Sequence, residues 1–456
     1  MNDPTAFPGS NAAPRIAVIG GGWAGLAATV ELCLSGASPT LFEAGKQLGG
    51  RARSIAIDGH TLDNGQHILI GAYRETLRLM RAVGADPERC LTRLALDLHY
   101  PAASFHLRLP SAKLLPAPLR LAIGLLSASG CSLSEKLAAA RFMRFLNACG
   151  FRLATDCPVS ELLDRHGQRG SLRRYLWEPL CLAALNTAPQ NASAQIFANV
   201  LRDSLGGGRA DTDLLLPAGD LDRVFPAAAA AFIAAHRGTI RLSTRIDTIE
   251  SPFELDGDTF DIVILAVAPQ HAAGLLAGHA QTAALAQTLA SYDYEPITTV
   301  YAGYPPALRL PCAMLGLGNG RNEGVGQWVF DRGALGAAPG VMSFVLSAHG
   351  KRNTGEDGAL IEALHAELEA ALGRKLPPPL WQRVIRERRA TFSCRPGLAR
   401  PSAQTPRAGL WLAGDYTCAG YPATLEGAVR SGILAAHGAL DSARAPAGET
   451  AAAPAA

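Results

Sequence analysis

The chain has 456 residues, of which 48% are hydrophobic and 18% are charged, and its net charge is +3. This length predicts two or more lobes around a packed core, and the mild charge gives no reason to expect a nucleic-acid partner. Nine cysteines are dispersed without a C-x-x-C pair, which excludes a recognisable disulfide framework or zinc motif. Residues 1–13 contain no apolar run, so we expect a short disordered lead and no signal peptide. Because no stretch of about 20 uncharged apolar residues occurs, no transmembrane helix is expected.

A glycine-rich turn follows the first apolar segment. Residues 15–19 predict a strand, and residues 20–25 form the pattern G-x-G-x-x-G in front of a helix-forming stretch. In this pattern Gly20 allows the tight turn, Gly22 lets the backbone approach a pyrophosphate, and Gly25 lets the helix pack closely on the sheet. The turn therefore predicts a dinucleotide site with helix N-terminal amides facing the phosphates.

An acidic residue and a second glycine pair extend this motif. The predicted strand 39–42 ends in Glu43, about 20 residues beyond the glycines, where a carboxylate accepts hydrogen bonds from ribose hydroxyls. Residues 48–53, Leu-Gly-Gly-Arg-Ala-Arg, then place glycines and guanidinium groups within reach of the pyrophosphate. A simple nicotinamide dehydrogenase does not need this second clamp, so the run favours a flavin dinucleotide.

The middle of the chain divides into a helical part and a strand-rich part. From about residue 78 to residue 204, apolar positions repeat at spacings of three and four, which predicts a helical cap or substrate lobe. Residues 239–267 return to the nucleotide-binding sheet, and alternating strands over 297–346 predict a second sheet below a substrate cavity. The apolar stretch 114–133 is interrupted by prolines and Arg120; it is either a buried helix of the substrate lobe or a membrane-docking surface.

A second nucleotide-type motif lies near the C-terminus. Residues 409–412 predict another apolar strand, and it runs into Gly414 and Asp415. One such motif would indicate a nucleotide, whereas the two together indicate a flavin held at both ends. The segment from about Ser442 onward is rich in alanine and proline and is expected to be disordered.

With the turn, the ribose acid, the Gly-Gly-Arg run and the C-terminal Gly-Asp all present, the sequence resembles the flavin-containing amine oxidase and phytoene desaturase superfamily. The resemblance implies FAD and an α/β fold: a doubly wound, Rossmann-like FAD-binding domain with an inserted substrate domain of mixed sheet and helical cap. It implies that Asp415 bonds the ribityl chain, that the helix opening near 424–428 presents amides to the flavin, and that Ile246 packs on the adenine side. The implied FAD contacts are Gly20, Gly22, Trp23, Ala24, Gly25, Glu43, Ala44, Gly50, Arg51, Ala52, Ile246, Gly414, Asp415, Thr424, Leu425 and Ala428.

Four internal segments narrow the resemblance. Residues 63–73, 176–187, 192–197 and 211–217 look like the squalene-associated FAD-dependent desaturases, a family better described as hydroxysqualene dehydroxylases of bacterial squalene and hopanoid synthesis. This similarity implies an oxidoreductase that reductively removes the hydroxyl of hydroxysqualene to give squalene. It also implies an isoprenoid lipid as the partner. We expect a cytoplasmic protein in peripheral contact with the inner face of the bacterial membrane, because a C30 hydrocarbon must be taken from a bilayer.

The implied reaction needs a proton donor and a long, dry, apolar cavity. Protonation of the substrate hydroxyl and loss of water would leave an allylic cation, which accepts a hydride from reduced FAD. The predicted catalytic residues are His67, Asp63 and Asp213, and Glu178 is a further candidate for the donor. No metal motif and no second nicotinamide motif occur in the sequence, so no metal is expected and the electron donor for FAD stays open.

Three alternatives remain on the same fold. A carotenoid or phytoene desaturase would share every flavin motif. A flavin amine oxidase commonly needs an aromatic pair, for which Tyr416 and Tyr421 are available. A non-catalytic prenyl-lipid carrier should lose the flavin clamp, yet Glu43, Arg51 and Asp415 are all present.

The predicted organisation splits the FAD-binding domain into three parts, residues 14–75, 205–290 and 401–440. The helical cap or substrate lobe takes residues 76–204, and the substrate-domain sheet takes residues 291–400. Residues 441–456 are predicted to be a disordered tail.

Overall fold

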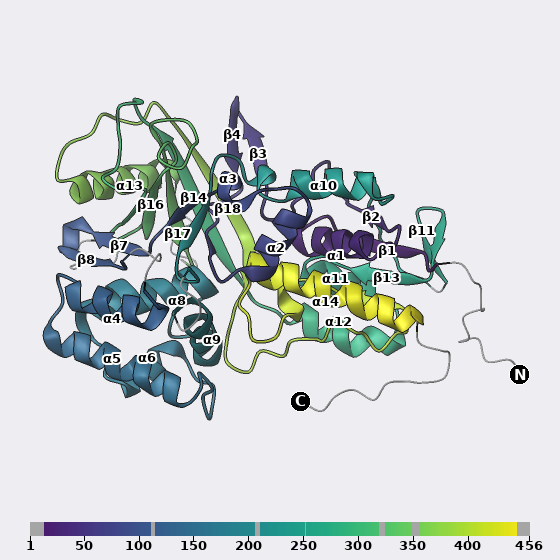
Figure 1. Cartoon of the computed structure of the whole chain (residues 1–456). Coiled ribbons are helices and arrows are strands. Elements are labelled where there is room, and N and C mark those ends of the chain that lie inside the picture. Colours follow the sequence, from purple (N-terminus) through teal and green to yellow (C-terminus); the bar gives the residue numbers. More distant parts are fainter. Residues whose placement is uncertain are drawn as a thin grey trace, which may run out of the picture.

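The computed structural model describes residues 13–110, 115–205, 210–250, 252–318, 324–348 and 356–444. Figure 1 shows two lobes, with a parallel sheet and its helices on the right and an antiparallel sheet above a layer of helices on the left. The long helix at the C-terminal end of the described chain lies beside the first helix, so the two ends of the sequence meet in the right-hand lobe.

The right-hand lobe is built on a five-stranded parallel sheet. Its order is β10-β2-β1-β13-β19, and every neighbouring pair is parallel. The central strands are apolar throughout because helices cover both faces of a doubly wound sheet. The strands are β1 (Ile16–Ile19), β2 (Thr40–Phe42), β10 (Thr239–Arg241), β13 (Ile262–Leu265) and β19 (Leu410–Leu412). The packed helices are α1 (Trp23–Leu34), α10 (Pro226–Ala235), α11 (Pro269–Leu276), α12 (Ala283–Ala290) and α14 (Leu425–Arg444).

The left-hand lobe contains a five-stranded antiparallel sheet in the order β15-β16-β17-β14-β18. Helix α13 (Asp357–Leu372) packs on one face through Leu360, Leu364 and Leu368. The strands are β14 (Tyr294–Gly303), β15 (Met314–Gly316), β16 (Trp328–Asp331), β17 (Val341–Ser347) and β18 (Trp381–Phe392). This mixture of a doubly wound parallel sheet with an inserted mixed lobe is the fold class that the sequence predicts.

A helical cap lies against the second sheet (Figure 1). Its helices are α4 (Ala117–Ser127), α5 (Leu133–Ala148), α6 (Val159–Arg165), α7 (Gly170–Leu172), a π-helical turn over Arg173–Trp177, α8 (Glu178–Leu185) and α9 (Ala194–Leu205). The stretch 114–133 thus becomes α4 and the start of α5, although residue 114 lies outside the described residues.

The helical prediction for residues 78–204 is wrong over residues 91–108. This segment forms the strands β6 (Leu91–Leu94), β7 (Asp97–Tyr100) and β8 (Phe105–Arg108). Leu96, Leu98 and Tyr100 are buried and alternate with more exposed residues, a period of two that fits a half-buried strand. Strand β6 pairs with β9 (Leu214–Pro217), which also pairs with β5 (Leu69–Ile70), and this small sheet joins the cap to the first lobe.

The first four residues of the predicted C-terminal tail, residues 441–444, are helical. Helix α14 continues through Arg444, because Ala439 and Leu440 still pack into the core of the first lobe. Residues 445–456 and most of the predicted N-terminal lead, residues 1–12, lie outside the described residues.

Within the described residues, none of the helices has the length and apolar character needed to cross a membrane. The remaining elements are α2 (Arg74–Ala82), α3 (Pro87–Cys90), β3 (Ser54–Ile57), β4 (His60–Asp63), β11 (Phe253–Leu255) and β12 (Asp258–Phe260).

Candidate active site

The glycine turn between β1 and α1 packs in very close contact with the backbone beside it. Gly20 has a φ of 109°, which favours glycine, and its N–H donates to the Phe42 carbonyl at 2.7 Å. A Cβ added to Gly25 would lie 1.9 Å from the Gly20 carbonyl oxygen. Only a glycine at this position lets α1 pack so closely behind the turn.

Glu43 stands at the end of β2, beside the turn. Its carboxylate accepts hydrogen bonds from the Gly21 N–H at 2.7 Å and from the Gly45 N–H at 2.6 Å. Charge-assisted bonds of this kind fix the orientation of a carboxylate. The side chain is therefore held in place at the edge of the cavity that the turn borders.

The second glycine pair packs directly onto the first turn. The Gly49 N–H donates to the Gly21 carbonyl at 2.8 Å, and the Trp23 indole N–H donates to the Ala52 carbonyl at 2.9 Å. Arg51 then reaches across the molecule, where its guanidinium pairs with the Asp415 carboxylate at 2.9 Å. Two motifs separated by more than 360 residues thus meet in one ion pair.

The C-terminal motif is ordered by contacts behind it. The Gly414 N–H donates to the Ser431 hydroxyl at 2.8 Å, so the Gly-Asp turn is tied to α14. Arg400 donates to the carbonyl oxygens of Asp415, Tyr416 and Tyr421, which holds the loop before α14 in one shape. The N-terminus of α14 is thereby aimed at the same cavity as the first turn.

These motifs line one large cavity of about 1090 Å³. All the predicted FAD contacts except Gly25 line it, namely Gly20, Gly22, Trp23, Ala24, Glu43, Ala44, Gly50, Arg51, Ala52, Ile246, Gly414, Asp415, Thr424, Leu425 and Ala428. The buried Gln270 Oε1 and Tyr416 hydroxyl, also from lining residues, have no hydrogen-bond partner among the described residues. Since buried polar atoms normally have partners, this lining fits a polar ligand such as a flavin dinucleotide.

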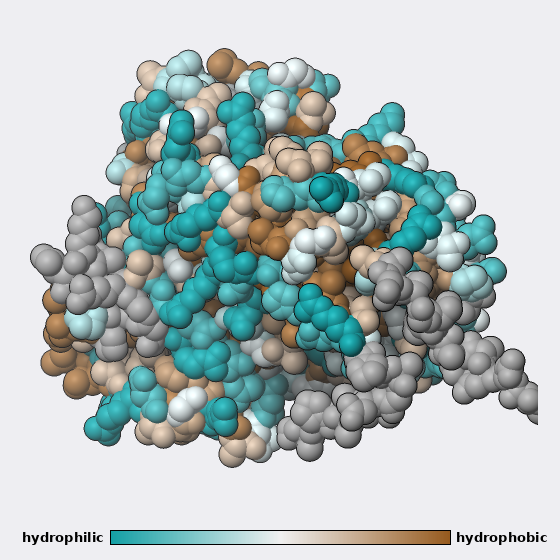
Figure 2. Space-filling model, turned by 45° about the vertical axis from the view of Figure 1, so that its right-hand side comes forward, coloured by the Kyte–Doolittle hydropathy of each residue, from teal (hydrophilic) through white to brown (hydrophobic). Residues whose placement is uncertain are grey.

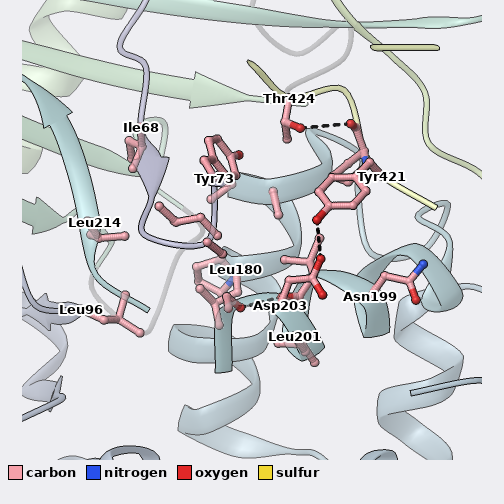
Figure 3. Close-up of a pocket in the computed structure, with 18 of the residues that line it drawn as sticks. Ile68, Tyr73, Leu96, Leu180, Asn199, Leu201, Asp203, Leu214, Tyr421 and Thr424 are labelled. Carbon is pink, nitrogen blue, oxygen red and sulfur yellow. Dashed lines mark hydrogen bonds between the residues drawn. The ribbon is translucent and has the colours of Figure 1, made fainter. Parts of the chain in front are cut away.

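A second, apolar cavity of about 150 Å³ adjoins the first (Figure 3). Strands β5 and β9, helices α8 and α9 and the loop before α14 form its walls, and Leu96, Leu180, Leu201 and Leu214 point into it. The two cavities share the lining residues Ile68, Tyr73, Ala183, Ala184 and Thr424. These five residues mark the junction between the cofactor cavity and the apolar cavity.

A few polar groups interrupt the apolar lining. The Tyr421 hydroxyl donates to the Asp203 carboxylate at 2.5 Å (Figure 3). It also accepts from Arg430 at 2.9 Å. At the junction, burial raises the pKa of Tyr73, and the nearby Glu426 adds to the shift, although a hydrogen bond with Thr424 opposes it. Tyr73 therefore keeps its proton at neutral pH and can donate a hydrogen bond.

The predicted catalytic residues lie in different surroundings. His67 lines the cofactor cavity, its Nδ1 lies 3.0 Å from the Gly65 carbonyl, and burial lowers its pKa despite the attraction of Asp63. Asp63 instead pairs with Arg332 at 2.9 Å, and Asp213 pairs with the fully buried Arg120 at 2.9 Å.

Asp63 and Asp213 are each engaged in an ion pair, so their carboxylates already have partners away from the reacting position. Neither residue is part of the lining of the two cavities described above. Glu178 likewise pairs with Arg173 at 2.8 Å.

Sequence reasoning did not single out Tyr73 or Asp203 as site residues. Tyr73 ends a segment that carried a family resemblance, which was a usable signal. Asp203 is an ordinary helix residue in the sequence, and only its contact with Tyr421 distinguishes it. Tyr416 lines the cofactor cavity and Tyr421 lines the apolar one, so these two rings do not enclose a single site. No group of His, Cys, Asp or Glu that could hold a metal occurs among the described residues.

A parallel-sheet dinucleotide fold, clamped at both ends around one cavity that meets an apolar cavity, is the architecture of a flavin-dependent oxidoreductase. The chain belongs to the flavin-containing amine oxidoreductase family, which matches residues 23–440. It is accordingly an FAD-dependent enzyme.

Two relatives align over nearly the whole chain. The hydroxysqualene dehydroxylase of Rhodopseudomonas palustris is 32% identical, covering 94% of this chain and 99% of the relative. The protein of the same name from Sinorhizobium fredii is 30% identical, covering 93% of this chain and 98% of the relative. Among solved structures, a triple mutant of putrescine oxidase superposes with a TM-score of 0.69 at 17% identity, covering 94% of this chain and 99% of that one. The structural likeness supports the fold alone.

Proposed function

We propose that this enzyme removes the hydroxyl group of hydroxysqualene to give squalene, as a step of squalene and hopanoid synthesis. The observation that carries the substrate assignment is the similarity to hydroxysqualene dehydroxylases along nearly the full chain. The junction of an apolar cavity with the cofactor cavity supports it, because a hydrocarbon substrate needs a dry, apolar wall beside the flavin.

The reaction is a reductive substitution at one carbon. The C–O bond breaks as the hydroxyl takes a proton and leaves as water, and a C–H bond forms when a hydride arrives at the same carbon. Bound FAD, in its reduced form, supplies that hydride. Glu43 and Asp415 would hold the ribose and ribityl hydroxyls, and the N-terminus of α14 would favour negative charge at the pyrimidine end of the ring.

The reacting carbon would lie at the junction of the two cavities. Tyr73 and Thr424 border both cavities there, which supports a role for the Tyr73 hydroxyl in holding the leaving oxygen. Because burial keeps Tyr73 protonated, it donates a hydrogen bond and does not itself ionise.

We assign proton delivery to His67, which neighbours Ile68 at the junction. Because burial lowers its pKa, the ring is mostly neutral at neutral pH, and its minor protonated form, a stronger acid than an ordinary imidazolium, would deliver the proton. The apolar cavity accommodates one section of a C30 chain beside the junction.

An anaerobic single turnover tests the proposal. The purified protein, with its flavin chemically reduced, is mixed with hydroxysqualene while the flavin spectrum is followed and the lipids are separated. We expect flavin reoxidation and one squalene per reoxidised flavin. Absence of reoxidation, together with bleaching of oxidised flavin by squalene or phytoene, would instead assign a desaturase and reverse the direction of electron flow.

A further inference from the structure

Two neighbouring helices of the cap expose a hydrophobic face. Along α4 the outward positions follow the spacing of one helical side, and α5 continues the row after a short turn. Figure 2 shows hydrophobic residues gathered at the lower left edge of the molecule, the side on which α4 and α5 lie in Figure 1. The α4–α5 face consists of Leu119, Ala122, Ile123, Leu126, Leu133 and Leu137, and its leucine and isoleucine residues are between 37% and 69% exposed.

The charged residues of the two helices are basic except for Glu135. The outward side of α4 carries no charged residue, since Arg120 points inward and is fully buried. One and two turns beyond Leu137, the same side of α5 carries Arg141 and Arg144, both exposed. The one acidic residue in these helices, Glu135, is occupied by N–H groups of Ser132 and Ser171. The result is a row of leucines followed by arginines.

Hydrogen bonds tie the two helices of this face together, and α4 connects the face to the apolar cavity. Lys136 donates to the carbonyl oxygens of Leu126 at 2.7 Å and Ala128 at 2.6 Å, which ties the end of α4 to α5. On its inner side α4 packs on α9, which lines the apolar cavity. Arg120 also anchors α4 to Asp213, the residue before Leu214 of the cavity wall. The exposed face thus lies one helix layer away from the substrate cavity.

We propose that the α4–α5 face docks on the surface of a lipid bilayer that contains anionic headgroups. The leucines enter the boundary between headgroups and acyl chains, and Arg141 and Arg144 contact the lipid phosphates. The charge pattern selects this occupant, since a bilayer offers apolar and negatively charged groups side by side. Docking would place the cavity wall next to the membrane from which an isoprenoid enters. This role in substrate uptake rests on the proposed function, whereas the docking itself does not.

Vesicle sedimentation of the FAD-loaded full chain tests the proposal. The protein is mixed with vesicles of phosphatidylcholine alone and of phosphatidylcholine with phosphatidylglycerol. We expect tighter binding to the anionic vesicles. The double variant Leu126→Ser/Leu133→Ser should bind at least roughly 100-fold more weakly, since it removes two apolar side chains from the lipid boundary. Arg141→Gln/Arg144→Gln should lose roughly 10-fold or more on the anionic vesicles alone.

The matched control is Leu380→Ser/Leu434→Ser, which changes two leucines of similar exposure elsewhere in the chain and should bind as the parent does. The proposal is overturned if the parent binds neither kind of vesicle, or if the control variant loses as much binding as the α4–α5 variant. A concentration-dependent dimer that the α4–α5 variant abolishes, without vesicle binding by the parent, would assign the face to a second copy instead. Turnover of detergent-dispersed hydroxysqualene is measured separately, so failure of the proposed reaction is distinguishable from failure of docking.

Discussion

Replacing Asp213 by Asn separates a structural role from the catalytic role that the sequence predicts for this residue. Asp213 accepts from the Arg120 guanidinium at 2.9 Å, and the two side chains are 7% and 0% exposed. Arg120 also donates to the Thr212 hydroxyl at 2.7 Å and to the Pro110 carbonyl at 2.8 Å. The asparagine keeps the size of the side chain but leaves a buried cation without its carboxylate.

The expected loss follows from this burial. Removing one partner of a buried ion pair costs about 3–5 kcal/mol, because the remaining charge is uncompensated. Arg120 keeps other acceptors, among them the Thr212 hydroxyl and the Pro110 carbonyl, so we expect a value near the lower end, about 3 kcal/mol in the free energy of unfolding. The double variant Arg120→Met/Asp213→Leu should recover much of the loss, since apolar replacement of a whole buried pair is often neutral.

Urea unfolding followed by tryptophan fluorescence measures the stability, and the anaerobic single turnover measures the chemistry. The rate per folded, FAD-loaded molecule should change by only a few-fold in Asp213→Asn. An unchanged urea midpoint combined with a loss of turnover of roughly 100-fold or more, the size expected for a general acid, would refute the structural assignment and restore Asp213 as the proton donor.

Three further variants probe the cofactor cavity and the junction. Glu43→Gln should weaken FAD binding roughly 10- to 150-fold, because it removes a charged hydrogen-bond acceptor; normal affinity by flavin fluorescence titration would contradict the cofactor assignment. Tyr73→Phe should slow single turnovers roughly 100-fold or more with little change in FAD affinity or unfolding, because it removes a hydrogen-bond donor to the leaving oxygen; a parent-like rate would remove Tyr73 from the reaction. For His67, the folded pKa lies below the usual 6.5. The unfolded chain therefore takes up the proton first, and stability falls as the pH drops below that value. The melting temperature of His67→Asn should depend less on pH over this range than that of the parent, and equal slopes would contradict the buried, neutral ring.

The cofactor side of the site was predictable because each part of it is a continuous motif. The glycine turn, the acid after β2, the Gly-Gly-Arg run and the Gly-Asp turn each carry their geometry in local backbone requirements. Gly25 shows how strict these are, since a Cβ there would meet the Gly20 carbonyl oxygen at 1.9 Å. That is why residues chosen from short segments come to line one cavity.

The catalytic side was less predictable because its residues are defined by distant partners. Asp63 lies in a segment that resembles the family, but its carboxylate is paired with Arg332, 269 residues away. Asp203 and Tyr421 are 218 residues apart and interact only once α9 and the loop before α14 come together. No local sequence pattern indicates such pairs. They nevertheless determine whether a carboxylate is engaged in an ion pair or is available for the reaction.

The sequence by itself determined the nucleotide-binding sheet, the flavin and the family, because these depend on short motifs whose spacing is set by backbone sterics. The sequence of residues 91–108 also contains the alternation of apolar and polar residues that is typical of strands. The helical spacing of the apolar residues around it obscured this pattern. Only the tertiary structure decided that Tyr73 stands where the two cavities meet, that Arg120 neutralises Asp213, and that the leucines of α4 face outward. These three facts depend on contacts between segments far apart in the chain, because such contacts determine which side chains are buried. Burial in turn shifts the pKa of a side chain, and it determines which apolar side chains stay exposed and can contact a lipid.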